Sequence, residues 1–171
     1  MCAPRLLFAL LLSLLLSTAP LHAEEGDENP LVGTWKLVSV IYRQADGSPA
    51  ATDWGENPQG LLIYDSSGNM AVQISRADRS RFKSGDRRQG SAVEIKAAFE
   101  SYMAYFGRYE VDWDQKTVTH ILTACTFPNW TGTSQRRFFE LNGERITLRT
   151  PPYPLGGQTV TGSLVWERIS Q

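Results

Sequence analysis

From about residue 31 onward, apolar and polar residues alternate in short runs, which is the pattern of β-strands that bury one face. Turn-forming residues separate the runs, and no regular alternation of strands with helices indicates a parallel sheet. The strongest hairpin signal is Asn142-Gly143, which favours a type I′ turn. The sequence predicts eight antiparallel strands, at residues 31–43, 59–65, 69–76, 107–113, 116–124, 132–141, 144–150 and 158–168.

One segment between the third and fourth strands has a helical pattern instead. It opens on Ser91-Ala92-Val93-Glu94, a capping box in which Ser91 and Glu94 satisfy backbone donors reciprocally. Gly107 can end the helix. We expect about four turns, with the aromatic stripe buried against the sheet across one of its ends, either as fixed packing or as a mobile lid. The apolar residues at helical spacing are Ile95, Ala98, Phe99, Tyr102 and Phe106.

Eight antiparallel strands leave two exposed edges unless the sheet closes on itself. A closed eight-stranded barrel removes both edges, and its interior is wide enough for one small ligand. The predicted fold is therefore an all-β, eight-stranded antiparallel up-and-down barrel with one inserted helix. An open sandwich is the less favoured alternative.

The first 23 residues have the pattern of a secretory signal peptide. Arg5 precedes an apolar run over residues 6–16, and the segment ends at Ala23. The run is shorter than the roughly 20 residues that a membrane span needs, so we expect cleavage and no stable membrane insertion. We expect residues 24–30 to be a flexible segment, residues 31–171 to form one domain, and the protein to be periplasmic or extracellular. Cleavage removes Cys2 and leaves Cys125 unable to form an intramolecular disulfide.

Charge and missing motifs exclude several classes of function. The chain has 17 Lys+Arg and 18 Asp+Glu, which argues against a general nucleic-acid binder. It has no nucleophile elbow, zinc-protease motif, phosphate-binding loop or dinucleotide fingerprint, so we expect no cofactor. His120 is the only histidine after residue 23, and no second histidine or cysteine stands at ligand spacing, so we expect no metal. The oligomeric state stays open.

Gly33-Thr34-Trp35 on the first strand and Arg168 on the last resemble the signature of lipocalins. Between them, residues 54–65, 127–130, 137–141 and 148–152 resemble more closely the lipocalin-like domain family of small bacterial and fungal proteins. The resemblance spans about residues 31–168. It implies a β-barrel that binds a small hydrophobic molecule, with Arg168 stacked on Trp35 at one end. Some lipocalin-like proteins are enzymes, but the shared segments carry no catalytic residue across.

Several polar and aromatic side chains are candidates for the interior of such a barrel. His120 shares a strand face with Val118 and Leu122, as a satisfied interior group, a ligand contact or an acid–base catalyst. Arg76 begins a basic stretch, residues 76–88, that is either a solvated loop or a cationic gate for a carboxylate-bearing ligand. Whether Arg137 or Arg149 points inward stays open. The candidate ligand-binding residues are Tyr64, His120, Tyr102 and Arg76, with Trp54 and Trp130 in loops at the barrel mouth.

Two functions from different classes fit this pattern. The first is an exported carrier or sensor that binds one small hydrophobic or amphiphilic molecule in its barrel. The second is a cofactor-free isomerase, cyclase or hydrolase that acts on a hydrophobic metabolite, with His120 as acid–base catalyst. A carboxylate within hydrogen-bonding reach of His120 would favour the enzyme, and a histidine walled off by packed side chains would oppose it.

Overall fold

The computed structural model describes residues 29–52 and 54–169. The predicted signal peptide lies outside the described residues, as do residues 24–28 of the segment expected to be flexible. Two residues of that segment contact the domain: the Asn29 amide donates to the Tyr109 hydroxyl, and the Pro30 carbonyl accepts from Arg168. Within the described ranges, no helix is long and apolar enough to cross a membrane.

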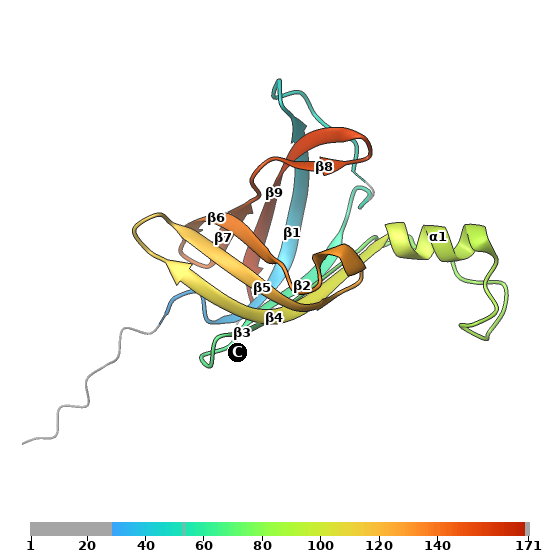
Figure 1. Ribbon diagram of the computed structural model, residues 1–171, viewed down its shortest axis with the longest axis horizontal. Helices are drawn as coiled ribbons and strands as arrows, with labels where there is room; N and C mark the ends of the chain where they lie inside the picture. Colours follow the sequence, from blue (N-terminus) through green and yellow to red (C-terminus); the bar gives the residue numbers. More distant parts are fainter. Residues whose placement is uncertain (1–28, 53, 170–171) are drawn as a thin grey trace, which may run out of the picture.

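The strands form a closed antiparallel barrel, as predicted (Figure 1). Sheet neighbours follow chain order from β1 to β7, β9 comes next, and β9 then pairs with β1 from Trp35↔Arg168 to Gln44↔Val160. β8 pairs with β9 and extends it as a short hairpin outside the eight-stranded ring. The strands are β1 (Gly33–Gln44), β2 (Gln59–Tyr64), β3 (Asn69–Ser75), β4 (Tyr102–Asp112), β5 (Thr117–Cys125), β6 (Ser134–Asn142), β7 (Arg145–Arg149), β8 (Tyr153–Leu155) and β9 (Gln158–Arg168).

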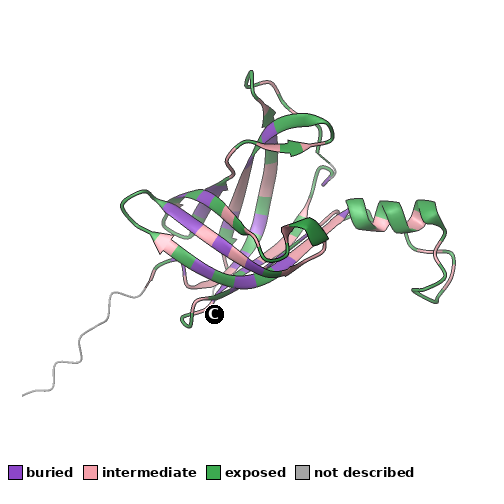
Figure 2. Cartoon of the chain, in the orientation of Figure 1, coloured by how far each residue is buried: buried purple, intermediate pink, exposed green. Residues whose placement is uncertain are grey.

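Alternate residues of each strand point into the barrel and form one core, seen as alternating buried and exposed bands in Figure 2. At one end of the barrel, which we call the tryptophan end, the Arg168 guanidinium lies 4.1 Å from the ring centroid of Trp35. Arg168 also donates to the carbonyl of Val32 at 2.7 Å. The stack implied by the family resemblance is therefore present. The opposite end, which we call the loop end, carries the β1–β2, β3–β4, β5–β6 and β7–β9 connections.

The inserted helix is shorter than the sequence predicts. α1 (Ala92–Glu100) has the expected capping box, with Glu94 N donating to Ser91 Oγ at 3.3 Å and Ser91 N donating to Glu94 Oε2 at 2.8 Å. It ends at Glu100, however, and Tyr102 and Phe106 belong to β4, which pairs with β3 from its first residue. The apolar residues there also fit a two-residue period, and the pairing with β3 decides in favour of the strand.

The expectation that the helix buries an aromatic stripe against the sheet is wrong. α1 has no buried residue, and Val93 and Phe99 are 78% and 50% exposed. The helix projects away from the loop end of the barrel and covers neither the sheet nor the barrel opening (Figures 1 and 2). It meets the barrel through β4, the strand that follows it directly.

Three smaller features also differ from the sequence predictions. The β6–β7 hairpin has the loop Gly143-Glu144, with a positive φ of 56° at Gly143, while Asn142 is the last residue of β6. A type I′ turn needs positive φ at both loop residues, whereas here Gly143 has it and Glu144 does not, so the turn is of type II′ and the predicted type I′ is corrected. The short strand β8 and the 3-10 helix η1 (Pro128–Trp130) have too few residues to give a periodic signal.

Candidate functional site

Polar side chains from four strands meet inside the barrel around His120. His120 is 1% exposed, and both of its ring nitrogens have a tyrosine hydroxyl as partner. The Tyr64 hydroxyl of β2 lies 2.6 Å from Nε2, and the Tyr105 hydroxyl of β4 lies 3.1 Å from Nδ1. His120, Tyr64, Tyr105 and Arg137 of β6 form what we call the His120 network.

Arg137 is the inward-pointing arginine of the pair that the sequence left open. It alternates with the buried Phe139 and is only 8% exposed. Its Nη1 donates to the carbonyl of Arg136 at 2.8 Å, and its guanidinium also hydrogen-bonds to the Tyr105 side chain. Arg149 points outward and pairs with Glu140 at 2.7 Å.

Burial keeps His120, Tyr64 and Tyr105 neutral. It holds the pKa of His120 well below its usual 6.5, and the positive charge of Arg137 acts in the same direction. It also raises the pKa of Tyr64 and Tyr105 above the usual 10.0, an effect that Arg137 partly opposes. At neutral pH, the network therefore consists of a neutral imidazole, two neutral phenols and one guanidinium cation.

Aromatic rings lie above this network at the loop end. The Trp54 side chain is buried, and its Nε1 donates to the Tyr42 hydroxyl at 2.9 Å. Tyr153 of β8 contacts the rings of Tyr42 and Trp130 edge to face, with centroids 6.4 and 6.3 Å apart. Burial and the neighbouring Tyr42 raise the pKa of Tyr153, so this phenol is also neutral. We call Tyr42, Trp54, Trp130 and Tyr153 the aromatic cover.

A hollow of about 440 Å³ lies beside the cover at the loop end, lined by residues 54–57 and 76–78. It brings together Trp54 and Arg76, two residues that the sequence predicts for ligand binding. The Arg76 Nε pairs with the Asp78 carboxylate at 2.9 Å. This hollow places the start of the basic stretch next to the aromatic cover.

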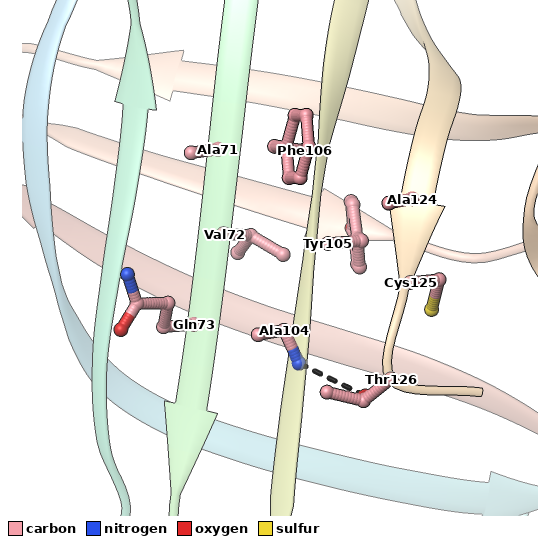
Figure 3. A pocket seen from close by; sticks show the side chains of 9 residues that line it. All are labelled: Ala71, Val72, Gln73, Ala104, Tyr105, Phe106, Ala124, Cys125 and Thr126. Carbon is pink, nitrogen blue, oxygen red and sulfur yellow. Dashed lines mark hydrogen bonds between the residues drawn. The ribbon is translucent and has the colours of Figure 1, made fainter. Parts of the chain in front are cut away.

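A second hollow, of about 350 Å³, follows the middle of β3, β4 and the end of β5 (Figure 3). Strand alternation places most of its lining on the outer surface, including Ala71, Gln73, Ala104 and the half-exposed Phe106. The inward-pointing Tyr105 also contributes to the lining. This hollow is therefore mainly a groove on the outside of the barrel, and Tyr105 is the residue that it shares with the His120 network.

The structure brings together some of the predicted binding residues and separates one. Tyr64 and His120 meet in the interior, and Trp54, Trp130 and Arg76 lie at the loop end. Tyr102 lies on the outer face, where its hydroxyl donates to Gln73 at 2.9 Å and Arg79 covers its ring. We leave Tyr102 out of the candidate site.

Sequence reasoning missed Tyr105 and Arg137 as members of the network. Tyr105 falls within the segment predicted as helix, where the alternation of a strand does not apply and gives no inward direction. Arg137 stands in Arg136-Arg137-Phe138-Phe139, which has no alternation to say which arginine points inward. Arg137 lies two positions from the apolar Phe139, so both belong to the same face of the strand. The sequence does not show that this face is the inner one.

The site has donors and acceptors for a ligand but no metal-binding arrangement within the described ranges, where no three His, Cys, Asp or Glu side chains come together. Its chemistry is hydrogen bonding through hydroxyls and imidazole, together with one positive charge, in an apolar surrounding.

The chain is similar to a known carrier protein, to a solved structure and to a domain family. The chain is 26% identical over 107 residues to the 4'-hydroxy-3'-methoxypropiophenone carrier protein ppsC of Aspergillus oryzae (strain ATCC 42149 / RIB 40), covering 58% of this chain and 96% of that protein. A solved structure of a REP1-NXSQ fatty acid transporter superposes with a TM-score of 0.37 at 8% identity, covering 83% of this chain and 98% of that one. Residues 32–169 match the lipocalin-like domain model, and the chain therefore belongs to the lipocalin-like domain family.

Proposed function

We propose that this protein is a carrier that binds one small hydrophobic molecule bearing a polar group inside its barrel. The observation that carries the proposal is the buried His120 network. Burying hydroxyls, an imidazole and a guanidinium costs free energy that an apolar core of the same shape avoids. A binding cavity, in contrast, needs a few such groups on apolar walls to orient its ligand.

The relative from Aspergillus oryzae supports the same function. Its name describes a carrier of an aryl ketone with a phenol group, which is a hydrophobic body with polar substituents. The aromatic cover and the tyrosine hydroxyls of this chain suit a ligand of that kind, because rings supply apolar contact and hydroxyls supply hydrogen bonds.

The geometry gives less support to an acid–base enzyme. A catalytic His120 needs a ring nitrogen directed at the substrate, and here each nitrogen already has a tyrosine partner. Among the described residues, no carboxylate pairs with the imidazole to orient it. Burial also favours a neutral imidazole over the protonated form that a general acid requires. Carrier function uses His120 as a fixed hydrogen-bonding group and needs no proton transfer.

Export is part of the proposal, supported by the signal-like residues 1–23. Expressing the full chain in a bacterial host and sequencing the N-terminus of the exported product tests it. We expect the mature chain to begin at Glu24, and a product that stays intracellular with its first 23 residues intact would contradict export.

Binding is tested by isothermal titration with 4'-hydroxy-3'-methoxypropiophenone and with dodecanoic acid. To locate the bound molecule, Leu122, which points inward on β5, is replaced by phenylalanine or tryptophan to fill the interior. Thr119→Trp, on the outer face of the same strand, is the control. We expect the interior substitutions to reduce affinity in proportion to side-chain size and the control to retain it. Equal affinity in all variants would place the ligand outside the barrel, and no binding of either ligand or of any molecule extracted from the source would refute the carrier.

A further inference from the structure

The barrel interior contains a positive charge that no described carboxylate neutralises. Four other arginines have an ion-pair partner: Arg76, Arg145, Arg149 and Arg168 pair with Asp78, Glu167, Glu140 and Glu144. All four are more exposed than Arg137. Other arginines without an ion pair are exposed to solvent, whereas Arg137 is the one buried guanidinium among the described residues, and burial is where a missing counter-ion costs most.

We infer that the ligand itself carries the missing charge, and that Arg137 and Tyr105 bind the carboxylate of a hydrophobic acid inside the barrel. This inference rests on the proposed carrier function and narrows the class of its ligand. It distinguishes an acid from the neutral aryl ketone that the relative's name describes.

The chemistry of the neighbouring groups favours a carboxylate. A guanidinium presents several N–H donors in one plane, which matches the two oxygens of a carboxylate. Tyr105 offers a hydroxyl beside it, and the neutral His120 and Tyr64 add no charge that would repel an anion. An uncharged ligand would leave the guanidinium without compensation.

A second observation comes from the loop end. The basic stretch, residues 76–88, has six basic and two acidic residues, and all of its basic residues except Arg76 are exposed. It begins at the hollow beside Trp54, next to the aromatic cover. Beyond Arg76 the stretch runs beside α1, with Lys83 N donating to Glu94 Oε1 at 2.8 Å. Its positive charge raises the local concentration of anions near this part of the molecule. It thus favours the same sign of ligand charge as the interior.

The test compares acids with their uncharged esters on three proteins. The probes are dodecanoic acid with methyl dodecanoate and 3-phenylpropanoic acid with its methyl ester, and the neutral 4'-hydroxy-3'-methoxypropiophenone reports on carrier function independently. The proteins are the wild type, Arg137→Met and Arg149→Met. Arg149→Met is the matched control, because it removes an arginine of the adjacent strand that points outward.

We expect the wild type and Arg149→Met to bind each acid about tenfold to a hundredfold more tightly than its ester, the usual effect of a charged hydrogen bond. Arg137→Met should lose this preference while its affinity for the esters stays within about threefold. Arg137→Gln, which keeps hydrogen bonds without charge, should also lose it and serves if the methionine variant does not fold.

Four outcomes overturn the inference. Acids and esters that bind the wild type equally, or an acid preference that survives in both Arg137 variants, refute the role of Arg137. Binding of the neutral ketone without binding of any acid refutes the carboxylate but leaves the carrier standing. If neither class binds, carrier function and inference fail together, and the interior charge has a structural role.

Discussion

Replacing His120 by leucine removes the hydrogen-bond partner that two buried tyrosines share. The Tyr64 hydroxyl then has no hydrogen-bond partner among the described residues, because its contact at 2.6 Å is to His120. Tyr105 is less affected, since its hydroxyl also bonds to Arg137. Leucine fills much of the space of the imidazole, so the main change is the loss of hydrogen bonds.

The expected cost follows from these contacts. A buried polar group left unsatisfied costs about 1–3 kcal/mol, and Tyr105 contributes at the low end because of Arg137. Burying leucine in place of a polar ring offsets part of this, which leaves a net loss of about 2–3 kcal/mol. With an m-value of about 1–3 kcal/mol/M, the urea midpoint should fall by about 0.7–3 M.

The assay is a double-mutant cycle of urea unfolding followed by tryptophan fluorescence. Adding Tyr64→Phe to His120→Leu removes the unsatisfied hydroxyl, so the double variant should be about 1–2 kcal/mol more stable than the sum of the single effects. Tyr102→Phe, whose hydroxyl lies on the outer face, should add to His120→Leu without coupling. A coupling below about 0.5 kcal/mol between Tyr64 and His120 would refute the network as an energetic unit.

Other predictions concern pH, the tryptophan end and the aromatic cover. Because burial lowers the pKa of His120 in the folded state, the unfolded chain binds the proton first as pH falls below about 6.5. The free energy of unfolding should then drop by up to about 1.4 kcal/mol per pH unit. If the same dependence of stability on pH between pH 7 and 5.5 persists in His120→Leu, this assignment is contradicted. Arg168→Met should lose about 1–3 kcal/mol of stability in thermal unfolding, because it removes the stack on Trp35 and the hydrogen bonds to backbone carbonyls. Arg145→Met removes an exposed ion pair and should lose under about 0.5 kcal/mol. Equal losses in the two variants would contradict this difference. Trp130→Ala should weaken ligand affinity in isothermal titration, and unchanged affinity would remove this residue from the site.

Much of the barrel follows from the sequence alone. The predicted strands agree with the observed ones to within a few residues, apart from the start of β4, because a buried face imposes a two-residue period that is visible locally. Closure follows from the number of antiparallel strands and their exposed edges. The Trp35–Arg168 contact follows from the family resemblance, which assigned both residues before any distance was known.

Only the tertiary structure decided how the interior is arranged. The helix ends at Glu100 because pairing with β3 outweighs a local pattern that fits both periods. Arg137 points inward because β6 is held between β5 and β7 in one register, which the run Arg136-Arg137-Phe138-Phe139 does not encode. One partner of His120 comes from β4, the neighbouring strand, and the curvature of the sheet brings Tyr64 of β2 to it across two strands. Periodicity reports which face a residue occupies, but contacts across a barrel depend on register and curvature, which arise only when all the strands are paired.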